Sequence, residues 1–187
     1  MGKKELEWTA KGKKELLKTV VLTVNEIESE GPGGRKGKYI VMDAPDWVIV
    51  VPVLGENFLM VRQWRHGNNS LSIEFPGGVI NKGESPEEAA IRETEEETGY
   101  KAGKLTYLGS ANPNPALMSN RVHFFAAEDL QGSGIQHLDE DEFLNVELVP
   151  MEELVEEVLA GAIADGKTQI AILKAAMLLK RQKEEES

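Results

Sequence analysis

A run of acidic residues in the segment 78–100 constrains this chain more than any other feature of its sequence. Ser85 and Glu88 have the spacing of a capping box, and the proline after Ser85 suits the first position of a helix. Gly99 is a natural C-terminal stop. The sequence therefore predicts a single helix over Pro86–Thr98.

One face of this predicted helix is small and acidic. Successive residues of a helix are rotated by 100°, which places the acidic residues on this face and other residues on a second flank. The composition of that flank is typical of a protein core. Glu93 and Glu97 are like charges at i,i+4, which costs roughly 0.2–0.5 kcal/mol, and further acids crowd the C-terminal end. Arg92 can bridge to Glu95 or Glu96, but one guanidinium cannot neutralise the whole set. The acidic face is Ala89, Glu93, Glu96 and Glu97, and the other flank is Ala90, Ile91 and Thr94.

Two interpretations of this face are open from the residues alone. An arbitrary run of glutamates is usually a solvated acidic surface. Oxygen ligands concentrated on one face instead favour a hard divalent cation, Mg²⁺ or Mn²⁺.

The spacing of the whole segment decides between them, because it resembles the signature of the Nudix hydrolases. That signature runs Gly, five residues, Glu, seven residues, Arg-Glu, an apolar residue, any residue, Glu-Glu, any residue, Gly and an apolar residue. Thr94 is the one soft departure, at a position that is usually aliphatic. The matching residues are Gly78, Glu84, Arg92, Glu93, Glu96, Glu97, Gly99 and Tyr100.

The resemblance implies roles for these residues. Glu93 and Glu97 match the principal metal ligands of the family. Glu96 matches either a neighbouring ligand or a carboxylate that contacts the ligands without binding the metal, and the Gly77 carbonyl matches a backbone ligand. Arg92 matches the arginine that orients the glutamates, so we count it with the catalytic residues in a supporting role. Glu84 is expected to organise the junction of loop and helix.

The general base is expected outside the signature. The acidic loop Leu138–Phe143 resembles the loop from which ADP-ribose pyrophosphatases draw a catalytic glutamate. Glu140 is the first candidate and Glu142 the second. A loop that only confers solubility is the alternative.

Residues before the signature indicate the substrate class. By resemblance to ADP-ribose and nucleotide-sugar pyrophosphatases, Arg65 contacts phosphate and Glu74 helps to hold the substrate. Strand alternation places residues 63 and 65 on one face and 62 and 64 on the other, so Arg65 is preferred to Arg62. Pro115, fifteen positions after Tyr100, resembles a proline of the ADP-ribose group.

The expected reaction is hydrolysis of ADP-ribose or a nucleoside diphosphate sugar to a nucleoside monophosphate and a sugar phosphate. Water activated by a divalent metal ion would attack phosphorus. One alternative is a pyrophosphatase that removes nucleoside triphosphates, although such enzymes are usually shorter. The other is a catalytically silent ADP-ribose sensor, against which the retained carboxylates argue.

Composition narrows the remaining function classes. The 187 residues are 41% apolar and include no cysteine, which excludes disulfides, thiolate metal sites and cysteine catalysis. A formal net charge of -11 argues against nonspecific nucleic-acid binding. His66, His123 and His137 lack metal-binding spacing. With neither a secretory signal nor a membrane-spanning run at its start, the chain is expected to be cytoplasmic.

The order of predicted elements is that of a mixed α/β fold. The resemblance sharpens this to an α/β/α sandwich with a mixed sheet, preceded by an N-terminal β-hairpin. Strands are predicted at Lys18–Glu28, Tyr39–Met42, Trp47–Val53, Phe58–Gln63, Leu71–Phe75, Lys104–Leu108, Arg121–Ala126 and Glu142–Leu148, and further helices at Met151–Ala160 and Thr168–Arg181.

Two segments with different roles are expected: an N-terminal strand segment, residues 1–44, and a catalytic domain, residues 45–187. The N-terminal strands are too apolar for a free tail, and a lone hairpin is marginal in water. By resemblance the segment builds a homodimer and encloses the nucleoside. Alternatively it extends the sheet of its own subunit. Trp8 is a candidate base-stacking residue, with core or interface packing as the alternative.

Overall fold

The computed structural model describes residues 5–132, 134–138 and 142–185. It divides into two compact units. The N-terminal unit contains the residues up to Asp46 together with Asn112–Arg121, and the sandwich unit contains Trp47–Ala111 together with the residues from Val122 on.

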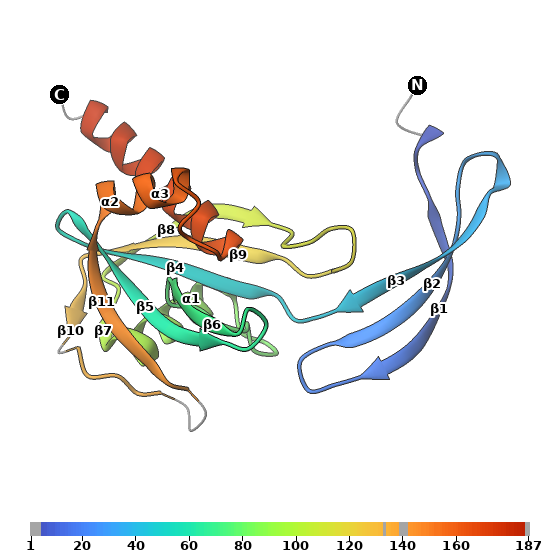
Figure 1. Ribbon diagram of the computed structural model, residues 1–187, viewed down its shortest axis with the longest axis horizontal. Coiled ribbons are helices and arrows are strands. Elements are labelled where there is room, and N and C mark those ends of the chain that lie inside the picture. Colours follow the sequence, from blue (N-terminus) through green and yellow to red (C-terminus); the bar gives the residue numbers. More distant parts are fainter. Residues whose placement is uncertain (1–4, 133, 139–141, 186–187) are drawn as a thin grey trace. The chain divides into compact units, whose positions relative to one another are not determined.

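The sandwich unit is built on a mixed six-stranded sheet (Figure 1). The strand order is β11-β5-β4-β9-β8, with β6 paired to β5. β4 and β9 are parallel, and the other neighbouring pairs are antiparallel. The strands are β4 (Trp47–Leu54), β5 (Asn57–Arg65), β6 (Ser70–Glu74), β8 (Lys104–Ala111), β9 (Val122–Glu128) and β11 (Leu144–Pro150).

Helices cover both faces of this sheet. β4 is buried on both sides, which explains its continuous apolar sequence. Val48 and Val50 pack in a cluster with Ala89 and Ala90 of α1 (Pro86–Thr98). The alternating residues of β4 pack in a second cluster with α2 (Met151–Leu159) and α3 (Gly166–Glu185), namely Ile49 and Val51 with Leu154, Ile172 and their neighbours. The predicted α/β/α sandwich is confirmed.

The acidic helix has the predicted limits. The Ser85 side chain accepts a hydrogen bond from the Glu88 amide at 3.2 Å, and the Glu88 carboxylate accepts one from the Ser85 amide at 2.8 Å. Gly99 adopts the left-handed conformation at the C-cap, where its N–H bonds to the Glu95 carbonyl. The local sequence therefore sets both ends of α1.

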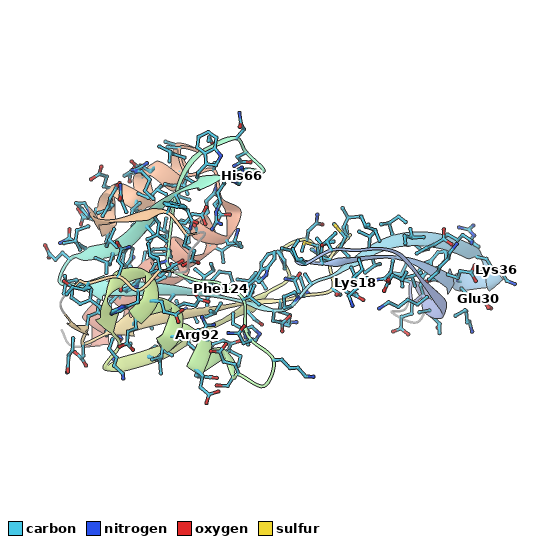
Figure 2. All side chains as sticks on the ribbon, turned by 90° about the horizontal axis from the view of Figure 1, so that it is seen from below. Lys18, Glu30, Lys36, His66, Arg92 and Phe124 are labelled. Atoms are coloured by element: carbon cyan, nitrogen blue, oxygen red, sulfur yellow. The ribbon has the colours of Figure 1, made fainter. Side chains whose placement is uncertain are left out.

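The N-terminal unit is a three-stranded antiparallel sheet in the order β1-β2-β3. Its strands are β1 (Thr9–Lys18), β2 (Thr23–Glu30) and β3 (Lys36–Asp43), and a short helix η2 (Pro32–Gly34) forms the turn before β3. Glu30 and Lys36 are paired across the β2–β3 end, as Figure 2 shows. Two backbone hydrogen bonds connect the segment Asn112–Arg121 to β3 within this unit. The Met42 N–H donates to the Leu117 carbonyl, and the Ser119 N–H donates to the Met42 carbonyl.

The predicted hairpin corresponds to β2 and β3, but β1 was not predicted. Two bulges, at Ala10/Gly12 and Glu15/Leu17, break its alternation, and Lys13 and Lys14 lie between them. The predicted start of β2 at Lys18 was also too early. The Thr19 hydroxyl accepts the amides of Val21 and Leu22 and holds this stretch in a turn.

Two very short strands also escaped prediction. They are β7 (Tyr100–Lys101) and β10 (Gln131–Gly132), which pair with each other directly after α1. Within the described part of the chain, no helix is long and apolar enough to cross a membrane.

Candidate metal and active site

Two carboxylates of α1 are buried one helical turn apart. Glu93 is 7% exposed and Glu97 is 3% exposed. They share the buried face of the helix with Ala89, Ala90 and Thr94, whose small side chains let the helix approach β4 closely. A solvated acidic surface is therefore excluded for this pair.

The Pro76–Gly78 loop lies against both carboxylates. Its Pro76 and Gly78 carbonyls accept hydrogen bonds from β4, each at 2.9 Å. The Gly77 N–H points the other way and donates to Oε2 of Glu97 at 3.1 Å. Because backbone groups alternate along an extended segment, the Gly77 carbonyl also faces away from β4.

Gly78 is required for this approach. A Cβ at Gly78 would lie 2.4 Å from Oε1 of Glu93, and one at Gly77 would lie 2.2 Å from the Val48 carbonyl oxygen. Two side-chain-free residues thus allow the loop to fit between β4 and the carboxylates.

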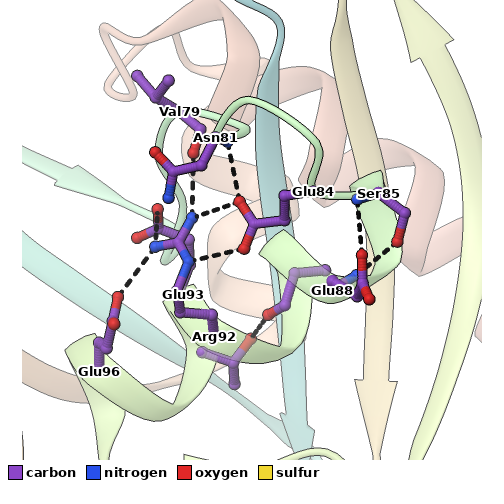
Figure 3. Close-up of polar contacts among 10 residues, drawn as sticks. Val79, Asn81, Glu84, Ser85, Glu88, Arg92, Glu93 and Glu96 are labelled. Atoms are coloured by element: carbon purple, nitrogen blue, oxygen red, sulfur yellow. Dashed lines mark hydrogen bonds and ion pairs between the residues drawn. The ribbon is translucent and has the colours of Figure 1, made fainter.

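Arg92 joins the loop to the helix (Figure 3). Its Nε and Nη2 donate to the two oxygens of Glu84 at 2.8 and 3.0 Å. Its Nη1 donates to Glu93 at 2.8 Å and to Glu96 at 3.0 Å, and Nη2 also reaches the Val79 carbonyl at 3.1 Å. Of the two bridges expected within the helix, the structure shows the one to Glu96. Glu84 also accepts the Asn81 amide, which fits the expected role at the loop–helix junction.

The protein only partly neutralises the buried pair. Burial, and after it the negative charge of Glu93, raise the pKa of Glu97 to about 8, although the Gly77 N–H and Arg65 oppose the shift. Burial likewise raises the pKa of Glu93, against the effect of Arg92. An additional cation beside this pair would favour the ionised forms.

A hard divalent cation fits the donor chemistry of this site. Glu93, Glu97 and the Gly77 carbonyl offer oxygen donors, as Mg²⁺ and Mn²⁺ require. Within the described ranges, no group of three or more His, Cys, Asp or Glu side chains is already arranged around a cation position. Glu93 and Glu96 are instead bonded to Arg92.

Arg65 and Glu74 form a second polar pair in the sandwich unit. Nε and Nη2 of Arg65 donate to the two oxygens of the buried Glu74 at 2.7 and 2.6 Å. Arg62 pairs instead with Glu147 of β11. The predicted separation of Arg62 from Arg65 is thus confirmed.

Of the two candidate bases, only Glu142 is among the described residues. Its negative charge contributes to the raised pKa of both Glu93 and Glu97. Glu140 lies outside the described residues.

Comparison with known proteins decides the family. Residues 44–169 match the NUDIX domain, which is more than half of the chain. The chain belongs to the Nudix family. It is 36% identical over 171 residues to an ADP-ribose pyrophosphatase of Bacillus subtilis strain 168, covering 90% of this chain and 92% of that protein.

Two further proteins are similar to this chain over most of its length. The Nudix chain is 33% identical over 157 residues to a methanol dehydrogenase activator of Bacillus methanolicus, covering 83% of this chain and 84% of the relative. A crystal structure of an ADP compounds hydrolase superposes with a TM-score of 0.84 at 27% identity, covering 97% of this chain and 98% of that one.

Thr94 shows how this Nudix signature tolerates its one departure. The side chain is fully buried, and its hydroxyl donates to the Ala90 carbonyl at 2.7 Å. Since the hydroxyl has a partner within the helix, a polar residue fits where an aliphatic one is usual.

The other two candidate substrate residues belong to the N-terminal unit. Trp8 is 44% exposed, and its ring meets Tyr39 edge-on at 5.5 Å and lies against Gly31. Pro115 lies in the segment Asn112–Arg121 and is exposed. Their roles toward a substrate stay predictions.

Gln136 is a residue at this site that the sequence did not indicate. Its Nε2 donates to the Glu97 carbonyl at 2.7 Å. The adjacent backbone N–H of His137 donates to the Glu96 carbonyl at 2.8 Å. A glutamine in a loop has no sequence signature for such a contact, which depends on a fold that returns residues 136 and 137 to the end of α1.

Proposed function

We propose that this Nudix protein hydrolyses the pyrophosphate bond of ADP-ribose or of a nucleoside diphosphate sugar, releasing a nucleoside monophosphate and a sugar phosphate. The observation that carries the proposal is the buried Glu93–Glu97 pair against the Pro76–Gly78 loop. The near full-length match to an ADP-ribose pyrophosphatase supports the substrate class.

Glu93, Glu97 and the Gly77 carbonyl would hold the metal ion, with Glu96 as a neighbouring ligand. Mg²⁺ is the proposed ion and Mn²⁺ the alternative. When bound, it screens phosphate charge and makes water a better nucleophile. Arg92 supports the site because it is bonded to Glu84 and also donates hydrogen bonds to Glu93 and Glu96.

Arg65 is the proposed phosphate contact. Glu74 occupies its Nε and Nη2, which fixes the plane of the guanidinium. Nη1 is then the group that we propose for the substrate. Glu74 holds the substrate indirectly in this arrangement, by orienting Arg65.

A glutamate of the loop before β11 is the proposed general base. The contribution of the Glu142 charge to the raised pKa of Glu97 supports Glu142, whereas the resemblance in sequence favours Glu140. Comparing Glu142→Gln with Glu140→Gln decides between them. The base variant should lose about 10²- to 10⁴-fold in kcat with little change in KM, and the other should stay close to the parental enzyme.

A panel of nucleotides with Mg²⁺ tests the proposed reaction. Phosphate release is measured with a coupled phosphatase for ADP-ribose and nucleoside diphosphate sugars, and with inorganic pyrophosphatase for nucleoside triphosphates. We expect the first group to have the highest kcat/KM. Preference for triphosphates would support the sanitising alternative, and ADP-ribose binding without turnover would support a sensor.

The N-terminal unit is proposed to form a homodimer and to help enclose the nucleoside, with Trp8 and Pro115 as contacts. Among the described residues of its three strands, Asn25 is the one buried side chain. Large apolar side chains lie exposed on them, including Leu16, Leu17, Tyr39 and Ile40. A sheet without its own core needs a partner surface.

Light scattering on the full chain and on a chain that starts at Ala44 tests this assembly. We expect a dimer for the former and loss of both dimer and activity for the latter. A monomeric full chain, or a shortened chain that is dimeric and fully active, would contradict the roles assigned to residues 1–44 and 45–187. The predicted cytoplasmic location is tested by cell fractionation.

A further inference from the structure

The last turn of α1 has backbone carbonyls that the helix cannot satisfy by itself. Carbonyls at the C-terminal end of a helix have no partner within it and need a donor from the cap or from elsewhere in the fold. The Gly99 N–H at the cap donates to the Glu95 carbonyl at 2.9 Å, and the His137 N–H donates to the Glu96 carbonyl at 2.8 Å. The next carbonyl is that of Glu97.

A side chain from the segment 134–137 supplies the donor for Glu97. The half-buried Gln136 donates its side-chain amide to the Glu97 carbonyl at 2.7 Å. The segment lies directly on the end of the helix, since a Cβ at Gly99 would be 2.3 Å from the Ile135 nitrogen. The hydrogen bond is thus part of a close contact between this segment and the last turn of α1.

Glu97 is therefore held at both ends. Its carbonyl accepts the Gln136 amide, and Oε2 of its buried carboxylate accepts the Gly77 N–H at 3.1 Å. Glu93 lies one turn earlier, in the body of the helix, where a carbonyl is bonded within the helix itself. Loss of the Gln136 bond should therefore loosen Glu97 and leave Glu93 in place.

We propose that Gln136 is a positioning residue for the metal ligand Glu97, because its side-chain amide fixes the last turn of α1 and with it the carboxylate of Glu97. The inference rests on the proposed function, in which this carboxylate holds a divalent cation. Gln136 touches neither substrate nor metal in this role. A residue 39 positions beyond Glu97, outside the signature, thus helps to set the metal affinity of the signature.

Calorimetric titration with Mn²⁺ at pH 8 tests this role in Gln136→Met and in a matched control. Gln169→Met also removes a glutamine Nε2 bond to a backbone carbonyl, that of Ile163 at 2.6 Å. Both variants should lose a similar, small amount of thermal stability, since each loses one neutral hydrogen bond. The Mn²⁺ affinity should fall by about 10-fold in Gln136→Met, because groups that orient metal ligands are worth about 10- to 100-fold, and should stay at the parental value in Gln169→Met.

A second variant and a double-mutant cycle show whether the effect passes through Glu97. Gln136→Asn keeps an amide at this position but is one methylene shorter, so its Mn²⁺ affinity should fall as well, and it carries the test if Gln136→Met does not fold. In a Glu97→Gln background, Gln136→Met should cause no further loss of Mn²⁺ affinity, because the ligand through which Gln136 acts is already changed.

Three results would overturn the positioning role alone while the parental protein binds Mn²⁺. The first is a parental Mn²⁺ affinity in both folded Gln136 variants. The second is an equal loss of affinity in Gln169→Met, and the third is an undiminished loss in the Glu97→Gln background; either would indicate a general structural effect. A parental protein that binds no Mn²⁺ and hydrolyses nothing in the nucleotide panel would refute the proposed function and this inference together.

Discussion

The buried face of α1 and the N-terminal sheet use the same charged residues in opposite ways. On the sheet, Lys38 is bonded to Glu26 at 2.7 Å and Glu28 at 3.0 Å, and its side chain is 60% exposed. On α1, one arginine, 29% exposed, serves three glutamates. Water solvates most of the charged groups around Lys38, whereas the charged groups around Arg92 depend on contacts within the protein.

Burial distinguishes the candidate metal site on α1 from the solvated charges of the N-terminal sheet. The partners of Lys38 raise its pKa, which only reinforces a charge that is already present. For Glu97, burial is the main cause of a pKa raised to about 8, so an added cation would favour the ionised carboxylate near pH 7. The number of charges in a sequence does not reveal this difference. The adjacent glycines and alanines do, because they let the backbone pack against the carboxylates.

The largest expected effect is the loss of activity in Glu97→Gln. An amide is a poorer ligand for a hard cation, while its oxygen can still accept the Gly77 N–H. We expect kcat with Mg²⁺ to fall by roughly 10²-fold or more, since even groups that only orient metal ligands are worth about 10- to 100-fold. The matched variant on the sheet, Glu28→Gln, should keep full activity. Near-parental turnover of Glu97→Gln at saturating Mg²⁺ would remove the contrast between the two regions.

Adding one methyl group should have the next largest effect. Gly78→Ala places a Cβ 2.4 Å from the Glu93 carboxylate, whereas a Cβ at Gly12 of β1 comes no closer than 3.5 Å to any neighbour. We therefore expect Gly78→Ala to lower kcat/KM by about 10-fold or more through displacement of Glu93. Gly12→Ala should leave both activity and stability near parental values. Steady-state kinetics and thermal melting distinguish these outcomes, and equal effects at the two glycines would be inconsistent with a tightly packed carboxylate.

The pH dependence of stability sharpens the comparison. The folded-state pKa of Glu97, about 8, lies above its ordinary value of 4.5. Between these values the native state binds a proton that the unfolded chain releases, so the free energy of unfolding decreases as pH rises and levels off above about pH 8. The contribution is fully present below about pH 4.5 and amounts to a few kcal/mol at most.

Urea unfolding with a chelator present measures this dependence from pH 4.5 to 9. Glu97→Gln should lack the decrease assigned to Glu97 and should be more stable than the parental protein at pH 9. Parallel curves for the two proteins would show that Glu97 ionises normally in the folded state.

The smallest effect is expected on the exposed sheet. Lys38→Gln removes two surface ion pairs in which the Lys38 and Glu28 side chains are 60% and 58% exposed, and surface pairs of this kind contribute little. Its melting temperature should match that of the parental protein within error and should not depend on salt. A clear loss of stability would mean that the sheet charges are less solvated than the isolated unit indicates.

Much of the sandwich unit could be predicted because its signals are local. The Ser85–Glu88 capping box and Gly99 define α1, and the apolar segment Trp47–Val53 predicts the strand observed as β4. The signature glutamates and Arg92 could be found by spacing alone. All of these depend on residues that are close in sequence.

The features that were missed depend on contacts between distant residues or on broken patterns. β1 was missed because its bulges and lysines hide the alternation. Gln136 reaches the Glu97 carbonyl 39 positions earlier in the chain, through a backbone path that no local pattern encodes. The ranking of Glu140 over Glu142 could not be decided by sequence either, because both are acids of the same loop.

Direct measurement of Mn²⁺ binding tests the central claim, that the buried pair of α1 is a divalent metal site. Calorimetric titrations at pH 8 would compare the parental protein with Glu97→Gln and with Glu28→Gln from the exposed sheet. The account predicts binding that is retained in Glu28→Gln and is weakened by at least about 10-fold in Glu97→Gln. Equal Mn²⁺ affinity in all three proteins would contradict it.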